Sequence, residues 1–252
     1  MKVCIVSGRY PATEFDSAIN HKVYADTFGY SYAHCNWPTK EKNRYLNKMH
    51  YISMYLDVYD YIFWIDDDAF FFDFEKDIME YAPKGEAFLS ICKSPSYKSL
   101  KTFFSSGQFI IRSTSKSKEF IQQVILQDLE VVKSWWTDDL GYFSNGDQDS
   151  MIYIIQTNPN FNKAAQLYDY KQFNSRPENL FEDEVHRPLI LHFTGKVDVK
   201  KNNYLKVQEK LKLHSSLVPD KFLKGYNLHF YKKPRKQGFK EKLKKLIKWL
   251  KP

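Results

Sequence analysis

Tyr61-Ile62-Phe63-Trp64-Ile65-Asp66-Asp67-Asp68 is the stretch that decides the fold of this 252-residue chain. Its first five residues form an uninterrupted apolar run, which is typical of a central parallel strand covered on both faces. Three aspartates follow at once, although aspartate is depleted in strands and costly to bury without compensation. In open α/β sheets, ligands bind beyond the carboxyl ends of the strands. We therefore expect a ligand site where this strand ends.

The segments around this strand alternate between strand and helix patterns in the first half of the chain. A short β-branched run ends in the turn Ser7-Gly8, and the helical pattern that follows stops at Gly29. Such alternation predicts an α/β fold with a parallel sheet. The expected strands are Val3–Val6, Tyr30–Cys35, Tyr61–Ile65, Ala87–Ile91, Gln108–Arg112 and Leu189–Leu191, and the expected helices are Ala18–Phe28, Glu41–Leu56, Ser117–Val132, Gln148–Gln156 and Asn203–Leu217.

The formal net charge of +8 is concentrated at the C-terminus. Residues 232–252 contain ten Lys or Arg and one Glu, a net charge of +9. Residues 1–231 hold the other 28 Lys or Arg and 29 Asp or Glu, a net charge of −1. The pI near 9.1 is therefore no sign of a nucleic-acid-binding body. With 43% hydrophobic and 27% charged residues, the chain is neither disordered nor a membrane bundle.

Four features of the sequence indicate a reducing, cytosolic compartment. The three cysteines, Cys4, Cys35 and Cys92, have no CxxC spacing and form an odd set, which argues against a disulfide framework or a zinc site. The N-terminal apolar run is too short for a signal peptide, and no run reaches the roughly 18 apolar residues of a membrane span. The sequence also lacks an Asn-x-Ser/Thr acceptor. We expect a cytoplasmic protein.

The aspartate triplet is a candidate metal site. Asp66 and Asp68 point to the same side if the backbone stays extended, and two such carboxylates suit a divalent cation that in turn suits a diphosphate. His192 ends a later apolar strand and is a sensible third ligand, with Lys196 facing the phosphates. The alternatives are a solvated acidic turn at the triplet and a structural histidine at position 192.

The segment Gly146-Asp147-Gln148-Asp149-Ser150 precedes an apolar run and has two interpretations. It is a helix N-terminus with Asp147 as the cap and its acidic side chains favoured by the helix dipole. Alternatively, Asp147 and Gln148 lie at the reacting carbon of a bound sugar. The residues alone leave both interpretations open.

Seven segments together match a known family in order and spacing. The chain resembles the metal-dependent GT-A glycosyltransferases, and most closely the family of fungal α-galactosyltransferases and plant xyloglucan xylosyltransferases. The resemblance covers roughly residues 1–196. The matching segments are Val6-Ser7-Gly8-Arg9-Tyr10-Pro11 (V-T-G-S-x-P), Asn20-His21-Lys22-Val23-Tyr24-Ala25 before Gly29-Tyr30 (N-x-K-x-x-Y and H-G-Y), Lys48 (W-x-K), Trp64-Ile65-Asp66-Asp67-Asp68-Ala69 (W-x-D-S-D-A), Ser105-Ser106-Gly107-Gln108-Phe109-Ile110-Ile111-Arg112 (N-T-G-x-F-L-x-R), Asp147-Gln148 (D-Q-S-A) and His192-Phe193-Thr194-Gly195 (H-F-T-G).

This resemblance implies an α/β fold of the GT-A (Rossmann-like) type, a UDP-linked or other nucleoside-diphosphate-sugar donor and retention of the anomeric configuration. It implies Mn²⁺ or Mg²⁺ held by Asp66, Asp68 and His192, with Asp147 and Gln148 as catalytic residues near the anomeric carbon. The residues implied to bind the nucleotide sugar are Ser7, Gly8, Tyr24, Lys48, Asp67, Ser106, Gly107, Gly195 and Lys196.

The chain departs from the family pattern at several positions. Asp67 stands where the family has Ser, Ser105-Ser106 replaces Asn-Thr, and Asp149-Ser150 replaces Ser-Ala. Lys196 replaces a Cys, and a lysine after this motif resembles the H-F-x-G-x-x-K of a related retaining family. The N-terminal anchor and stem of the family have no counterpart in this sequence, so we expect an enzyme that is not built like a Golgi member.

Two further classes of protein compete with a glycosyltransferase. A phosphohydrolase with a strand-terminal D-x-D nucleophile fits Asp66-Asp67-Asp68 and the later Gly146-Asp147-Gln148-Asp149. Against it, that motif normally ends the first strand and is followed by Thr or Val, whereas here Ala69 follows a later strand. The other alternative is a non-catalytic carbohydrate-binding protein attached to a membrane, with which 17% aromatic residues are compatible.

The sequence predicts three regions: a catalytic domain at 1–200, a helical extension at 201–231 and a basic amphipathic helix at 232–252. In the last region the lysines lie opposite an apolar stripe, which is the pattern of a helix at the surface of an anionic membrane. The alternative is a tail helix docked on the body. We expect a peripheral protein on the cytosolic membrane face, with a glycan or lipid-linked acceptor. The residues expected to enter the lipid are Phe239, Leu243, Leu246, Ile247, Trp249 and Leu250.

Overall fold

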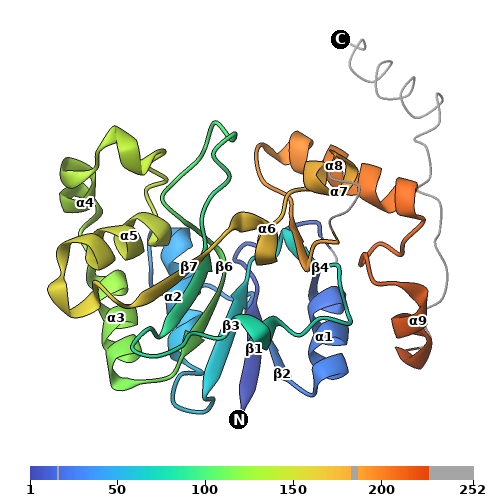
Figure 1. Cartoon of the computed structure of the whole chain (residues 1–252), viewed down its shortest axis with the longest axis horizontal. Coiled ribbons are helices and arrows are strands. Elements are labelled where there is room, and N and C mark those ends of the chain that lie inside the picture. Colours follow the sequence, from blue (N-terminus) through green and yellow to red (C-terminus); the bar gives the residue numbers. More distant parts are fainter. Residues whose placement is uncertain (16, 183–186, 227–252) are drawn as a thin grey trace, which may run out of the picture.

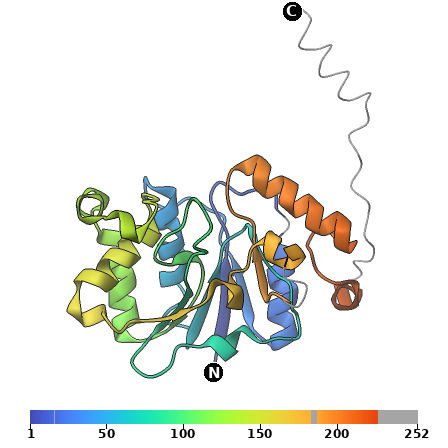
Figure 2. The same ribbon diagram turned by 45° about the horizontal axis from the view of Figure 1, so that its top comes forward.

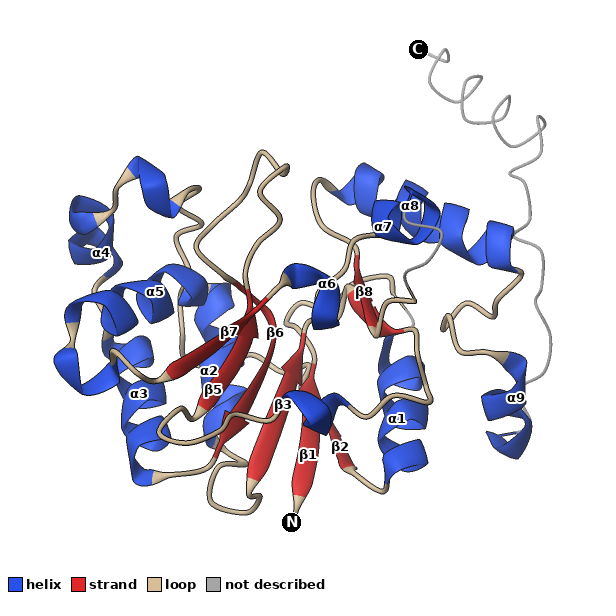
Figure 3. Ribbon diagram, in the orientation of Figure 1, coloured by secondary structure: helices blue, strands red, loops and turns tan. Residues whose placement is uncertain are grey.

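The computed structural model describes residues 1–15, 17–182 and 187–226 and contains a central sheet with helices on both sides (Figure 3). The main sheet has six strands in the order β2-β1-β3-β6-β5-β7, and a smaller sheet pairs β4 with β8. The strands are β1 Val3–Ser7, β2 Ser31–His34, β3 Tyr61–Ile65, β4 Ala69–Phe71, β5 Leu89–Cys92, β6 Ser105–Arg112, β7 Ala165–Tyr168 and β8 Ile190–His192.

The helices surround the main sheet (Figure 1). Five short 3₁₀ turns accompany nine α-helices in the described part of the chain. The helices are α1 Ser17–Phe28, α2 Asn47–Ser53, α3 Ser115–Leu126, α4 Leu129–Trp135, α5 Asp147–Thr157, α6 Tyr170–Phe173, α7 Pro177–Glu182, α8 Val197–Leu211 and α9 Asp220–Leu223, and the 3₁₀ turns are Arg44–Leu46, Ile78–Tyr81, Asp138–Leu140, Pro159–Phe161 and Lys224–Tyr226.

The prediction of a parallel sheet is confirmed for the first three strands of the chain. Of the later strands of the main sheet, one is antiparallel. β1 pairs in parallel with both β2 and β3, whereas β6 runs antiparallel to β3 and to β5. β7 is again parallel to β5. β6 reverses direction because the segment that joins it to β5 contains no helix, and a parallel return needs a long crossover.

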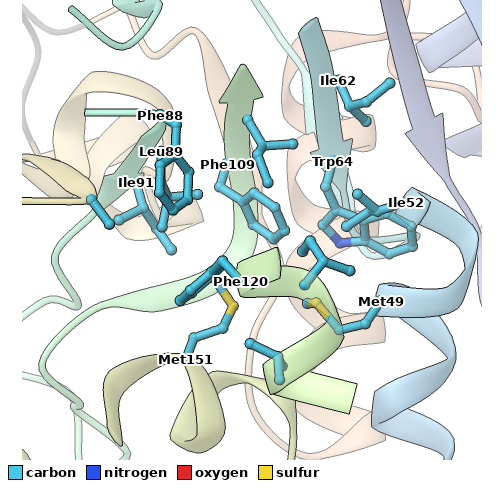
Figure 4. Packing of buried hydrophobic residues seen from close by; sticks show 14 of the residues in the cluster. Met49, Ile52, Ile62, Trp64, Phe88, Leu89, Ile91, Phe109, Phe120 and Met151 are labelled. Atoms are coloured by element: carbon cyan, nitrogen blue, oxygen red, sulfur yellow. The ribbon is translucent and has the colours of Figure 1, made fainter. Parts of the chain in front are cut away.

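Each face of the main sheet has its own apolar core. On one face, Trp64 and Phe109 pack with Met49 of α2, Phe120 of α3 and Met151 of α5 (Figure 4). The cluster on the opposite face combines residues of β1 and β3 with residues of α1 and β4. Full burial of one large apolar side chain contributes roughly 1.5–3 kcal/mol. These two layers hold β3 rigidly, and β3 carries the aspartate triplet at its end.

A third apolar cluster fixes the small sheet and the C-terminal helix. Phe70 of β4 and Leu191 of β8 pack with Phe193, Val207 and Leu217. Figures 1 and 2 agree in placing α8 beside the small sheet. The domain boundary expected at residue 200 therefore falls inside α8, whose first turns belong to the wall of the body.

Three helix predictions differ from the structure in their bounds. The segment expected to be helical over Glu41–Leu56 forms a 3₁₀ turn and the shorter α2. The pattern over Ser117–Val132 is divided into α3 and α4 because Asp128 caps a new helix, its carboxylate accepting the Glu130 N–H at 2.9 Å. The helix expected at Asn203–Leu217 is α8 and begins six residues earlier.

The basic segment 232–252, with the apolar stripe expected to enter a membrane, lies outside the described residues. Within the described part of the chain, no helix has the length and apolar character that crossing a bilayer requires.

Candidate functional site

Asp66 and Asp68 follow β3 directly and lie at the carboxyl end of the main sheet. The Trp64 indole donates a hydrogen bond to Asp66 Oδ1 at 2.7 Å, and the Asp66 N–H donates to the Gly107 carbonyl at 2.8 Å. Both contacts hold the Asp66 carboxylate toward β6. The expected ligand site at the end of this strand is therefore built from rigid elements.

His192 reaches the same place from the other end of the chain. β8 pairs with β4 in a register that sets Ala69 opposite His192, and the Phe193 N–H donates to the Asp68 carbonyl at 2.9 Å. His192 Nε2 lies 3.2 Å from Asp68 Oδ1. One ligand atom from each of Asp66, Asp68 and His192 lies within 4.8 Å of the other two. Two carboxylates and an imidazole are donors that suit Mn²⁺ or Mg²⁺, so the donor set fits the expected cation.

Gly107 makes this close approach possible. A Cβ placed on it would meet His192 Cε1 at 2.5 Å and Asp66 Oδ2 at 3.3 Å. Real Cβ atoms do not approach a neighbour within 2.5 Å, so any side chain here would push the imidazole away from the carboxylates. Gly107 thus contributes both the carbonyl that accepts the Asp66 N–H and the space that the imidazole occupies.

The charges of the triplet are strongly coupled. Burial by itself would raise the pKa of Asp68, but its interactions with His192 and Lys200 outweigh burial and hold that pKa well below its usual range. Burial and the adjacent Asp68 carboxylate raise the pKa of Asp67 to about 6. Burial also lowers the pKa of His192, against the attraction of Asp68. The site thus pairs an ionised Asp68 with an imidazole that favours its neutral form.

Lys48 connects the metal candidates to the second acidic centre. Its ammonium lies 3.3 Å from Asp66 Oδ1 and 3.0 Å from Asp147 Oδ2, and it donates to the Ser106 carbonyl at 2.9 Å. Burial tends to lower the pKa of Lys48, but the two carboxylates reverse this effect and raise it. Burial and the Asp66 charge raise the pKa of Asp147, with Lys48 and Ser106 opposing.

Ser106 and Gln148 complete this network. The Ser106 hydroxyl donates to Asp147 Oδ2 at 2.8 Å, and the Ser106 N–H donates to Gln148 Oε1 at 3.0 Å. The Gln148 amide also donates to the Thr102 hydroxyl at 3.0 Å. The structure therefore brings together Lys48, Ser106, Asp147 and Gln148, which come from three separate segments of the sequence.

The helix N-terminus expected at residues 146–150 is confirmed, with Asp147 and Asp149 in the first turn of α5, but Asp147 is not its cap. Gly146 occupies the N-cap position, and the Asp149 carboxylate accepts the Gly146 N–H at 3.2 Å and the Ser144 hydroxyl at 3.0 Å. The Asp147 side chain instead faces Lys48 and Ser106. Because Asp149 satisfies the helix end, the Asp147 carboxylate is available for another role.

Two cavities open at this end of the sheet and share a wall. One, of 170 Å³, is lined by Gly8 and the aspartate triplet together with Lys48 and Trp64. The other, of 510 Å³, lies between the loop after β1 and the start of α8 and has an apolar side. The residues common to both cavities are Arg9, Arg44, Tyr45, Asp68 and Lys200.

The predicted nucleotide-sugar residues divide between these cavities and the interior. Gly8 and Asp67 line the smaller cavity, and Gly195 and Lys196 line the larger one. Gly8 has φ 133°, and a Cβ there would stand 2.1 Å from the Cys35 carbonyl oxygen, so only glycine fits. The Ser7 hydroxyl is buried against the Tyr32 hydroxyl at 2.9 Å, away from the cavity surface.

Tyr24 was expected to bind the nucleotide sugar, and the structure places it in the core instead. Its ring is fully buried and stacks on Phe71 with centroids 3.5 Å apart, and its hydroxyl donates to the Lys76 carbonyl at 2.7 Å. The neighbouring Asn20 exchanges two hydrogen bonds with the Phe71 backbone, at 2.9 and 2.7 Å. The N-x-K-x-x-Y segment thus fixes β4 on α1 and has no access to a nucleotide.

Several residues of the site were missed by sequence reasoning. The Lys200 ammonium, rather than that of Lys196, forms the ion pair with Asp68. Arg9 and Arg44 line both cavities, and Asn174 lies behind His192. The helix in this region was expected to begin only at Asn203, so no predicted helical turn connected Lys200 with Lys196, whereas α8 begins at Val197. The arginines and Asn174 are in loops or short turns and carry no periodic pattern.

The chain is similar in structure to known glycosyltransferases. One is a glycosyltransferase involved in the glycosylation of the major capsid of PBCV-1, with a TM-score of 0.58 and 13% identity, covering 81% of this chain and 99% of that chain. Another is the apo form of the glycosyltransferase GlyE of Streptococcus pneumoniae TIGR4, with a TM-score of 0.51 and 12% identity, covering 92% of this chain and 66% of that chain. At these identities the likeness shows the fold.

The strand order and the site at the carboxyl end of β3 define an α/β enzyme of the GT-A type. Residues 32–205 match the family model described as "Nucleotide-diphospho-sugar transferase". The chain belongs to this family and is a glycosyltransferase. A search of curated proteins finds no significant match. Family membership decides against the phosphohydrolase and the non-catalytic binding protein.

Proposed function

We propose that this protein is a metal-dependent retaining glycosyltransferase that moves a hexose or pentose from a UDP-linked sugar to a glycan or glycolipid acceptor. The observation that carries the proposal is the convergence of Asp66, Asp68 and His192 beside the Lys48–Asp147 pair. One cluster suits a cation and its diphosphate, and the other offers the Asp147 carboxylate, which lies 3.0 Å from the ammonium of Lys48 in the wall of the smaller cavity. Both groups are needed for a reaction in which a sugar leaves a diphosphate.

The two connected cavities support a division of the donor into two parts. The larger cavity combines apolar walls with Arg9, Lys196 and Lys200, which fits a nucleoside next to two phosphates. The smaller cavity holds Lys48 and Trp64 and leads toward Asp147, which fits the sugar. In this arrangement the aspartate triplet lies at the border, where the bond to the sugar breaks.

The residues of this chain would then act in separate ways. Asp66, Asp68 and His192 would hold a divalent cation, which would supply Lewis-acid stabilisation of the leaving diphosphate. Lys200 and Arg9 add fixed positive charge on the same side, where negative charge develops as the bond breaks. Asp147, held in place by Lys48 and Ser106, binds hydroxyls of the sugar or stabilises its oxocarbenium-like centre.

The subfamily we propose is that of the fungal α-galactosyltransferases and plant xyloglucan xylosyltransferases. The order of the Trp64–Ala69, Ser105–Arg112, Asp147-Gln148 and His192–Gly195 motifs supports it. The side chains of Asp66, Ser106, Asp147 and His192 lie within one connected network, as motifs of a single active site require.

We also propose that the protein works at the cytosolic face of an anionic membrane. The support is the net charge of +9 in residues 232–252 and the apolar stripe within them. A basic amphipathic segment binds anionic lipid through both its charge and its apolar face. A lipid-linked or membrane-proximal acceptor would then meet the enzyme at this surface.

A screen of nucleotide sugars tests the proposed chemistry. The purified full-length protein is incubated with a panel of UDP- and GDP-sugars with Mn²⁺ or with EDTA, and release of nucleoside diphosphate is measured. We expect Mn²⁺-dependent release from a UDP-hexose or UDP-pentose, and its loss in Asp68→Asn. Anomeric configuration of the transferred sugar is read by NMR.

Lys118→Met is the matched control, because its ion pair with Asp57 is exposed and remote from the site. The control should keep the wild-type rate. Release of nucleoside diphosphate that persists in EDTA, or in Asp68→Asn, would contradict metal dependence. Transfer with inverted configuration would contradict the proposed subfamily.

A further inference from the structure

Arg176 is a buried cation next to the metal candidates. Its side chain is only 4% exposed, and among the described residues no carboxylate forms a salt bridge with it. Instead, its Nη1 donates to the Asn174 carbonyl at 2.5 Å and to Asn174 Oδ1 at 2.7 Å. The Asp68 carboxylate attracts this charge from beyond ion-pair distance, and a buried charge that makes no ion pair is costly, so the burial of Arg176 needs a reason.

The direction of these hydrogen bonds fixes the orientation of the Asn174 amide. A guanidinium has donors only, so the amide atom that faces Arg176 must be the oxygen. The same Oδ1 lies 2.9 Å from His192 Nδ1. An oxygen can only accept, and therefore His192 Nδ1 must carry a proton. In a neutral imidazole, this leaves the lone pair on Nε2.

Nε2 is the nitrogen that faces the carboxylates. It lies 3.2 Å from Asp68 Oδ1, so in the neutral tautomer two acceptors point at each other. Such a pair is favourable only when a cation lies between them, either a proton or a metal ion. The tautomer that Arg176 and Asn174 select is thus the one in which His192 can bind a divalent cation.

The backbone holds this pair of residues in register with His192. The segment from Asn174 to Arg176 runs alongside β8: the Ser175 N–H donates to the Ile190 carbonyl at 3.2 Å, and the His192 N–H donates to the Ser175 carbonyl at 2.8 Å. Asn174 is fully buried, and the Arg176 N–H donates to Asn179 Oδ1 at 2.8 Å. Neither side chain can drift from the imidazole without breaking these bonds.

We propose that Arg176 and Asn174 are positioning residues that hold His192 in its Nδ1-protonated tautomer and so prepare Nε2 for the metal ion. The inference rests on the metal-dependent function proposed above. Hydrogen-bond partners behind a histidine ligand fix its tautomer and ring orientation in many metal sites. Here the partner is an amide that a buried arginine keeps from flipping.

The first test reads the tautomer directly in the protein without metal. Nitrogen-15 NMR of His192 at pH 8 distinguishes a protonated from an unprotonated ring nitrogen, with His192→Gln used to assign the signals. We expect a protonated Nδ1 in the wild type, whether or not Nε2 also carries a proton, and a partly unprotonated Nδ1 in Asn174→Leu and Arg176→Leu. An unprotonated Nδ1 in the wild type would overturn the proposal.

The second test measures Mn²⁺ affinity by calorimetry or electron paramagnetic resonance. Asn174→Leu and Arg176→Leu should weaken Mn²⁺ binding about 10- to 100-fold. Asn174→Asp should restore binding, because a carboxylate also accepts from Nδ1 and pairs with Arg176. Arg112→Leu is the matched control: this arginine likewise donates two hydrogen bonds, here to the Gly85 and Ala87 carbonyls at 2.7 and 2.8 Å, and neither acceptor is next to His192.

A double-mutant cycle separates positioning from a general loss of structure. In the His192→Ala background, Asn174→Leu should cost no further Mn²⁺ affinity, since its effect acts through the imidazole. An equal loss in both backgrounds, or failure of Asn174→Asp to restore binding, would refute the proposal. Absence of Mn²⁺ binding in the wild type would refute the proposed function, while the NMR result would still decide the tautomer.

Discussion

Replacing Lys200 with methionine is expected to shift two affinities in opposite directions. The Lys200 ammonium pairs with Asp68, the carboxylate that also faces His192. Without nucleotide, this ammonium competes with a divalent cation for Asp68. When a nucleoside diphosphate enters, the released ammonium is positioned to pair with its phosphates, because Lys200 lines both cavities.

The size of both effects follows from the burial of the pair. The side chains are 21% and 7% exposed for Lys200 and Asp68. Two charges about 4 Å apart attract by about 4 kcal/mol at an effective dielectric constant of about 20, and desolvation offsets part of this. A hydrogen bond to a charged group contributes about 1.5–3 kcal/mol net. We therefore expect Lys200→Met to strengthen Mn²⁺ binding without nucleotide about 10- to 100-fold, and to weaken UDP binding with Mn²⁺ by a similar factor.

Titration calorimetry measures both affinities on the same protein, first with Mn²⁺ alone and then with UDP at saturating Mn²⁺. Lys118→Met is the matched control. It also removes one lysine charge, but the ion pair of Lys118 with Asp57 is exposed at 44% and 79%, and Lys118 lines neither cavity. Exposed pairs contribute only about 0–1 kcal/mol. The control should change either affinity by less than about fivefold.

Two results would refute this reasoning about Lys200. If Lys200→Met weakens Mn²⁺ binding in the absence of nucleotide, then Lys200 supports the site rather than competing for Asp68. If UDP affinity stays at the wild-type value, then Lys200 does not reach the phosphates.

Four further perturbations test other parts of the molecule. Gly107→Ala should weaken Mn²⁺ binding about tenfold or more, because the new Cβ would collide with His192, and the far-UV circular dichroism should stay unchanged. Wild-type Mn²⁺ affinity in this variant would show that the imidazole has room to move. Lys48→Met should lower the free energy of unfolding by about 3–5 kcal/mol in urea, since it leaves two carboxylates without a buried partner, and a loss below 1 kcal/mol would contradict this. Burial raises the pKa of Asp149 to about 6, so the folded state holds its proton more tightly than the unfolded chain and wild-type stability falls as pH rises from about 4 to 6. At 1.36 kcal/mol per pKa unit the fall is at most about 3 kcal/mol, and urea unfolding of Asp149→Asn should lack it; an identical pH profile would refute the assignment. Deletion of residues 232–252 should release the protein from phosphatidylserine vesicles in a sedimentation assay, and the membrane proposal fails if the shortened protein still sediments with them.

Much of the fold was predictable because local patterns report burial. The apolar run Tyr61–Ile65 predicted a central strand, and β3 has the same bounds. The helix expected to end before Gly29 does so, and Gly29 has a positive φ of 70°. The direction of strand pairing was harder to predict from the sequence. β6 was expected as a strand, but no local sequence pattern indicated that it alone among the described strands of the main sheet would run in the opposite direction.

The candidate site was predictable where chemistry and position in a strand coincide. The coincidence of an acidic triplet with a strand end pointed to Asp66 and Asp68, and the ligand atoms of both lie with His192 in one cluster. The prediction that Tyr24 binds the nucleotide sugar was wrong because its motif stabilises the core. A sequence motif alone does not distinguish a core-stabilising residue from a ligand-binding one. Lys196 and Lys200 are both on the correct segment, but which of them faces Asp68 depends on how α8 is rotated against the small sheet.

The sequence by itself determined the class of fold, the two carboxylates at the end of β3 and the separation of a nearly neutral body from a strongly basic terminus. These properties follow from periodicity and composition, which can be read from neighbouring residues without knowledge of contacts elsewhere in the chain. Only the tertiary structure decided that His192 would meet Asp68, 124 residues away, that Lys48 would join Asp66 to Asp147, and that Asn174 would contact both Arg176 and His192. Such contacts depend on the register of β4 with β8 and on the packing of α2 against the sheet, because a few ångströms of displacement decide whether two charged groups meet.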